Sequence, residues 1–132
     1  MPTNMTFAKV QAYLNAIADN PNNTMSINGS PHGRFWNVSY ELFTTGNVPG
    51  GDLVQCNNAP IPIIDRNHPE QSPFFLILSS AAGFCNISQM PLGGPYITDA
   101  DYQVTLADGE VVTGQQIAAD LFSWLTNHYP KG

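Results

Sequence analysis

Apolar residues recur at helical spacing near the start of the chain. Thr6 or Asn4 can cap a helix there, and an Asp-Asn-Pro sequence at positions 19–21 would end it. The spacing therefore predicts an amphipathic helix over residues 6–18. Its apolar face carries Phe7, Val10, Tyr13, Leu14 and Ile17.

A second stripe at helical spacing lies near the end of the chain. It predicts a helix from Gln115 to about His128, capped by Thr113 and ended by Pro130. We expect the first and last helices to pack together, because each has one apolar face to bury. The apolar face of the last helix carries Ile117, Leu121, Trp124 and Leu125.

Two further elements are predicted between these helices. Residues 74–78 are apolar nearly all round, which predicts a buried helix that opens at 68–70 with Asn67 as its cap and ends near Gly83. Alternating apolar residues on both sides of an Ala-Asp-Gly turn predict a β-hairpin from Tyr102 to Val112. Residues 35–43 fit a short helix or a strand. The loops between the elements are too long for a simple bundle, and loops of that length normally carry a function.

Composition limits the classes of partner. The chain has 132 residues, of which 42% are hydrophobic and 11% are charged, and its net charge is −6. One domain over residues 1–132 fits this length. With four lysines and arginines in all, we expect no nucleic-acid partner. No apolar run reaches the length of a membrane span, so we expect no membrane insertion, and we see no secretion signal.

Two cysteines, Cys56 and Cys85, are present without a Cys-x-x-Cys pair, so they cannot form a cysteine-rich zinc site alone. In a chain rich in Gly, Pro and Asn they suggest a disulfide formed in an oxidising compartment. Two buried free thiols remain the alternative.

One methionine stands in a loop whose path is strongly restricted by its neighbours. Met90 lies within Gln89-Met90-Pro91-Leu92-Gly93-Gly94-Pro95, where proline and glycine disfavour both helix and central strand. Its thioether is a soft donor and an accepted axial ligand of haem iron. The alternative is a methionine that fills a gap in the core.

Four motifs in order resemble the small cytochrome c domains of bacterial periplasmic and multi-domain proteins. They are the segments 67–75, 85–94 with Gln89-Met90-Pro91 inside, 97–99 and 124–130. The resemblance covers mainly residues 67–130. It implies a mostly α fold, with a cytochrome c-like arrangement of three main helices, long loops and an inserted β-hairpin near 102–112.

The sequence departs from that family at the haem-attachment site. Covalent attachment needs Cys-x-x-Cys-His, and the counterpart here, residues 28–33, has Asn28 and Pro31 at the cysteine positions but keeps His32. Covalent haem is therefore excluded. We expect a haem-free interaction or structural module with no cofactor, in a larger periplasmic or extracellular assembly and with a protein as partner. The space of the haem would then be filled from the aromatic residues Phe35, Trp36, Phe43, Phe84 and Tyr96.

The alternative function is electron transfer by haem bound non-covalently through His32 and Met90. A catalytic function has less support. No histidine is placed by the sequence to activate either cysteine as a nucleophile, and the carboxylates are too scattered to indicate a paired-carboxylate site. We expect no catalytic residues. A metal site from His32, His68 and His128 would require the fold to bring them together.

Overall fold

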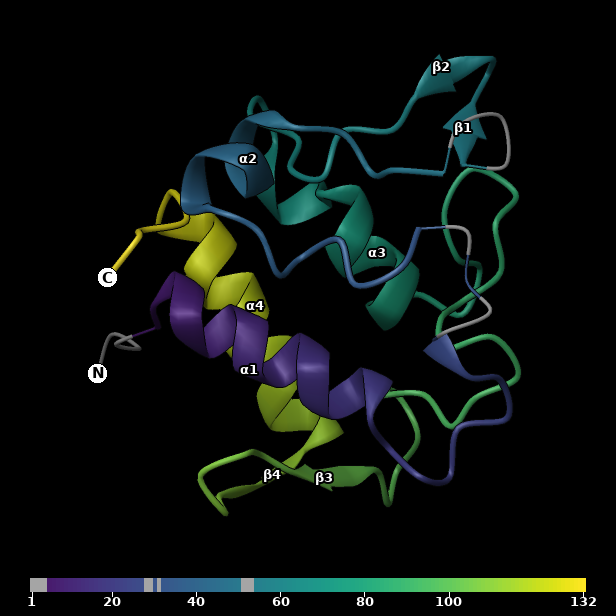
Figure 1. Ribbon diagram of the computed structural model, residues 1–132, viewed down its shortest axis with the longest axis vertical. Helices are drawn as coiled ribbons and strands as arrows, with labels where there is room; N and C mark the ends of the chain where they lie inside the picture. Colours follow the sequence, from purple (N-terminus) through teal and green to yellow (C-terminus); the bar gives the residue numbers. More distant parts are fainter. Residues whose placement is uncertain (1–4, 28–29, 31, 51–53) are drawn as a thin grey trace.

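The computed structural model describes residues 5–27, 30, 32–50 and 54–132. Figure 1 shows their arrangement, with the start of α1 and the C-terminal end of the chain on the same side of the molecule. Among the described residues, the elements in chain order are α1 (Phe7–Ala18), α2 (Tyr40–Thr45), β1 (Gln55–Cys56), β2 (Ala59–Pro60), the 3-10 helix η3 (Pro69–Gln71), α3 (Pro73–Ser79), β3 (Gln103–Thr105), β4 (Val111–Thr113) and α4 (Gly114–Thr126).

The two terminal helices form where the hydrophobic pattern predicts them. Thr6 accepts a hydrogen bond from the Lys9 amide at the start of α1, and Thr113 accepts one from the Gln116 amide at the start of α4. The two helices cross in Figure 1, and the Phe7 ring of α1 lies 6.5 Å from the Trp124 ring of α4. The Tyr13 hydroxyl on α1 donates to Asp120 on α4 at 2.5 Å. Their predicted packing is confirmed.

The expectation of a mostly α, cytochrome c-like arrangement of three main helices is wrong. The described residues form short helices together with two small antiparallel sheets, one pairing β1 with β2 and the other β3 with β4. The unexpected sheet arises because Asn57 and Asn58 both adopt positive φ, as the tight turn of a two-residue hairpin requires. The predicted hairpin is present as β3 and β4, with Val104 opposite Val112.

The predicted buried helix is divided in two. Ser72 has extended backbone, with φ −58° and ψ 135°, and separates η3 from α3. The cause is Pro73, which lacks an amide hydrogen and disfavours helical geometry in the residue before it. The Ser72 side chain, itself buried, accepts a hydrogen bond from the amide of Asp65, which lies before η3. As a result α3 begins only at Pro73, and it is seven residues long.

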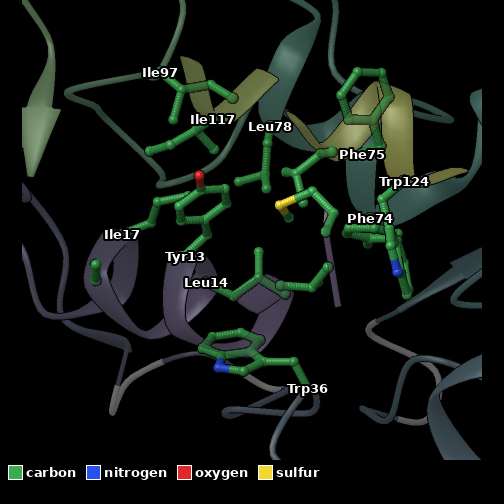
Figure 2. Close-up of a cluster of buried hydrophobic side chains, with 14 of the residues drawn as sticks. Tyr13, Leu14, Ile17, Trp36, Phe74, Phe75, Leu78, Ile97, Ile117 and Trp124 are labelled. Carbon is green, nitrogen blue, oxygen red and sulfur yellow. The ribbon is translucent and has the colours of Figure 1, made fainter. Parts of the chain in front are cut away.

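One hydrophobic core joins the four α-helices and the β3–β4 hairpin. Figure 2 shows Tyr13, Leu14 and Ile17 of α1 directed toward side chains of α3 and α4, with Trp36 packed beneath Leu14. Trp36 is buried although it lies in the loop after α1, and its indole nitrogen donates to the Asn15 side chain at 2.8 Å. The core therefore extends under the loop that leads to α2.

A disulfide joins Cys56 to Cys85, with their Cα atoms 5.7 Å apart. This confirms the predicted bridge and excludes the alternative of two free thiols. It links the β1–β2 hairpin to the loop after α3, so it ties together two segments on either side of α3 in the sequence. Disulfides of this kind form and persist in oxidising compartments. Within the part of the chain that the structure describes, no helix has both the length and the apolar character needed to cross a bilayer.

Candidate functional site

An apolar cavity of about 180 Å³ lies between α1, α3 and the loops that follow them. We call it the main cavity. It is lined by Leu14, Ile17, Ala18, Asn23, Met25, Ser26, Ile27, Ser30, His32, Phe35, Trp36, Phe74, Ile77, Leu78, Met90, Pro91 and Leu92.

A smaller cavity of about 110 Å³ adjoins it, and we call it the second cavity. Five residues line both cavities: His32, Phe35, Phe74, Ile77 and Met90. The remaining residues of the second cavity are Val48, Val54, Ile61, Pro73, Phe84 and Ile87. The fold therefore brings together His32 and Met90, which are far apart in the sequence, at the boundary between two apolar spaces.

Met90 is held in place by hydrogen bonds to the end of α3. Its amide donates to the Ile77 carbonyl at 2.8 Å. The preceding residue, Gln89, is buried, and its side-chain amide donates to the Leu78 carbonyl and to the Thr98 hydroxyl, both at 2.9 Å. These bonds satisfy carbonyls that the end of a helix leaves without partners. They fix the loop so that the Met90 side chain lies in the cavity wall.

Thr24 ties the segment after α1 to the same loop. Its amide donates to the Gly94 carbonyl at 2.9 Å, and its hydroxyl donates to the Gly93 carbonyl at 3.0 Å. Gly93 has φ +81°, and a Cβ there would lie 2.9 Å from the Thr24 Cβ, so only glycine allows this close approach. The contact places Met25, the next residue, beside the Met90 loop.

The third element of the wall is the loop that carries His32. The His32 ring nitrogen Nδ1 lies 2.7 Å from the Gly33 carbonyl. The backbone amide of His32 donates to the Ser30 hydroxyl at 3.3 Å. Because a carbonyl can only accept, Nδ1 carries the proton and Nε2 keeps its lone pair. The ring also meets the Phe35 ring edge-on at 5.3 Å between centroids. The positions Asn28 and Pro31, where the family has its haem-binding cysteines, lie outside the described residues.

Burial lowers the pKa of His32 from its ordinary value of 6.5, opposed in part by the hydrogen bond to the Gly33 carbonyl. An apolar environment disfavours the charged imidazolium. At neutral pH the cavity therefore contains an uncharged imidazole.

The lowered pKa predicts that acid weakens the fold through this residue. As the pH falls through 6.5, the unfolded chain takes up a proton at His32 before the folded protein does, so the free energy of unfolding falls. Urea unfolding at pH 7.5 and 5.5 measures this loss. His32→Gln should show a smaller loss over the same interval, because glutamine does not titrate. Equal losses in both proteins would contradict a buried neutral His32.

The aromatic residues proposed to fill the haem space divide between several places. Phe35 and Trp36 line the main cavity, and Phe84 lines the second cavity. Phe43 is fully buried elsewhere in the core, with its ring centroid 5.3 Å from that of Phe74. Tyr96 is not among the described residues that line either cavity.

Other candidate chemistry is not assembled by the fold. Cys56 and Cys85 are oxidised to the disulfide, so neither has a thiol to act as a nucleophile. No group of three or more His, Cys, Asp or Glu side chains is placed to hold a metal ion within the ranges that the structure describes. The fold therefore does not gather His32, His68 and His128 into one site.

The described walls of both cavities are almost entirely apolar and uncharged at neutral pH. They contain no carboxylate, lysine or arginine. What they offer a ligand is mainly apolar surface, with the imidazole of His32, the thioethers of Met25 and Met90, and the polar side chains of Asn23, Ser26 and Ser30. Met25 was not predicted from the sequence, because its position in the wall depends on the Thr24 contact, which joins segments 69 residues apart.

Comparison of the chain with known proteins identifies no relative. No protein-family model matches the sequence, and neither the curated proteins nor the solved structures contain a match.

Proposed function

We propose that the chain is a haem-free, non-catalytic binding domain that holds a small apolar molecule in the main cavity, against His32 and Met90. One observation carries the proposal: these two residues, selected from the sequence, line the same apolar space. A cavity of about 180 Å³ has room for one aromatic ring, since an apolar cavity of about 150 Å³ in another protein binds benzene.

The surface around the main cavity is consistent with the entry of an apolar ligand from solvent. Met25 and Leu92 line this cavity and are also exposed to solvent, at 52% and 46% of their surface. Large exposed apolar side chains beside an apolar cavity are typical of a binding site. A ligand that covers them would gain free energy from the burial of that surface.

Binding of toluene tests this proposal. A ligand that binds only the folded state stabilises it by about 1.4 kcal/mol at ten times its Kd, which corresponds to a rise in Tm of several degrees in a domain of this size. We therefore expect toluene to raise the Tm measured by circular dichroism.

Two variants of α3 make the test specific. Ile77→Trp places a large ring in the wall of both cavities and should abolish the toluene effect. Leu76→Trp is the matched control, because Leu76 is also half-buried on α3 but is not among the described lining residues. Near-ultraviolet circular dichroism establishes that both variants fold. An unchanged Tm of the parent protein in toluene would contradict the proposal.

The second candidate is electron transfer by non-covalent haem, with His32 and Met90 as axial ligands. The observation in its favour is the Nδ1 contact with Gly33, which leaves Nε2 available to iron and orients the ring. Against it, the macrocycle would have to unite both cavities by displacing the side chains between them, and no described lining residue supplies a cation for the propionates. We expect reconstitution with haem to give no low-spin His/Met spectrum. Such a spectrum, lost in both His32→Ala and Met90→Ala, would establish the electron carrier instead.

A periplasmic or extracellular location fits the disulfide, and a protein partner fits the proposed role within a larger assembly. With a net charge of −6, the chain suits a positively charged partner, and salt should weaken that association. The same charge argues against nucleic acid as the partner.

A further inference from the structure

The main cavity contains an unusual concentration of soft donor atoms. The structure describes three methionines, and two of them, Met25 and Met90, line this cavity together with His32. The third, Met5, is buried in the core and is not among the described lining residues. The Thr24 hydrogen bonds to Gly93 and Gly94 hold the segments of both lining methionines against each other.

We propose that the main cavity binds one monovalent copper ion, Cu(I), through the imidazole of His32 and the thioethers of Met25 and Met90. This inference goes beyond the proposed function, because it assigns a second ligand, a metal ion, to the same cavity. Copper would bind in place of the small apolar molecule, since both use the same space.

The donor set selects the metal. Thioether and imidazole are ligands that suit Cu(I), whereas Mg²⁺, Ca²⁺ and Mn²⁺ prefer the oxygen of carboxylates, carbonyls and water. No carboxylate is among the described residues that line the main cavity. Zinc sites normally include cysteine or carboxylate ligands besides histidine, and both cysteines are oxidised. A soft monovalent ion is therefore the cation that these side chains fit.

The surroundings of the donors fit a metal site as well. The Gly33 carbonyl accepts from His32 Nδ1 and so presents Nε2 as the ligand atom, which is the usual outer-shell arrangement of a metal-bound histidine. Met90 is fixed through its own amide to Ile77. Met25 is exposed at the mouth of the cavity and provides a route for the ion from solvent. The remaining wall is mainly apolar, with Asn23, Ser26 and Ser30 as its polar members, and it carries no charged side chain.

Anaerobic titration of the full chain with Cu(I), in competition with the chromophoric chelator bicinchoninate, tests the proposal. We expect one equivalent to bind. His32→Gln, Met25→Leu and Met90→Leu should each weaken binding by more than about tenfold, since loss of even an outer-shell partner costs that much. Met5→Leu and His68→Gln are the matched controls, and both should bind as the parent does. X-ray absorption of the copper complex should show nitrogen and sulfur neighbours.

A parallel toluene titration separates the two proposals. Copper binding that is weakened only in the three lining variants supports the Cu(I) site. Absence of copper binding, or binding that Met25→Leu and Met90→Leu leave unchanged, overturns it. If toluene still raises the Tm in that case, the binding function of the cavity stands without copper. If neither probe binds, both proposals are wrong.

Discussion

Replacing Trp124 with alanine should lower the free energy of unfolding by about 3–5 kcal/mol, the cost of removing a buried tryptophan. Trp124 is 1% exposed. Its ring lies 6.5 Å from that of Phe7 and 6.2 Å from that of Phe43, so it joins α4 to α1 and α2. Its indole nitrogen also donates to the Pro130 carbonyl at 2.8 Å, which holds the C-terminal segment against the helix. Urea unfolding of both proteins measures the difference.

Phe122→Ala is the matched control, because Phe122 lies on the same helix with 47% of its surface exposed. Phe122→Ala should lose much less free energy of unfolding than Trp124→Ala, since substitutions at exposed positions usually change stability by about 0.5 kcal/mol or less. A Trp124→Ala loss below about 1 kcal/mol would show that the first and last helices do not depend on this side chain.

Removal of the disulfide should be the second large effect. Cys56 and Cys85 are 29 residues apart in the sequence, and the chain-entropy estimate for a loop of that length is about 3–4 kcal/mol. We therefore expect the Cys56→Ala/Cys85→Ala variant to lose roughly that much stability relative to the oxidised parent protein. The reason is that the bridge restricts the unfolded chain.

The reduced parent protein is the control for that comparison, and it should match the double variant within about 1 kcal/mol. Mass spectrometry after alkylation without reduction should find no free thiol in the parent. Two alkylated cysteines, or a double variant as stable as the oxidised parent, would contradict the bridge and its role.

Elements with strong local signals were predicted correctly from the sequence. The spacing of Phe7, Val10 and Leu14 and the capping threonine at position 6 are sufficient to define α1. The turn at Asp108-Gly109 likewise defines the hairpin of β3 and β4, because Gly109 supplies the positive φ that the turn requires. In these cases the deciding interactions lie within a few residues.

The predicted secondary structure was wrong where one or two residues change the local backbone geometry. The apolar run 74–78 is helical, but Pro73 makes it start late and keeps it separate from η3. The two adjacent asparagines at 57 and 58 form the turn of the β1–β2 hairpin, which was not predicted from the sequence. These details, with the additional short elements they produce, account for the difference between the expected mostly α fold and the observed mixture.

The residues of the main cavity could be predicted only in part, because some of them are brought there by contacts between segments distant in the sequence. His32 and Met90 were selected because imidazole and thioether are chemically distinctive, and both were found in one cavity wall. Gln89 and Met25 were not selected, because their roles depend on contacts with Thr98 and with the Thr24 segment that only the folded chain brings about. The cavities themselves come from the packing of segments distant in the sequence, which a local pattern does not contain.

We expect the protein to bind its apolar ligand in the main cavity, with Met90 in the wall. The most direct test of this binding is NMR of protein labelled with ¹³C at the methionine methyl groups, recorded during a toluene titration. An aromatic ring in the cavity should shift the signals of Met25 and Met90 by its ring current and leave that of Met5, in the core, unchanged. We expect the Met25 and Met90 signals to shift together and to reach saturation. If toluene leaves the Met90 signal unchanged, or shifts Met5 as much, binding at the main cavity is contradicted.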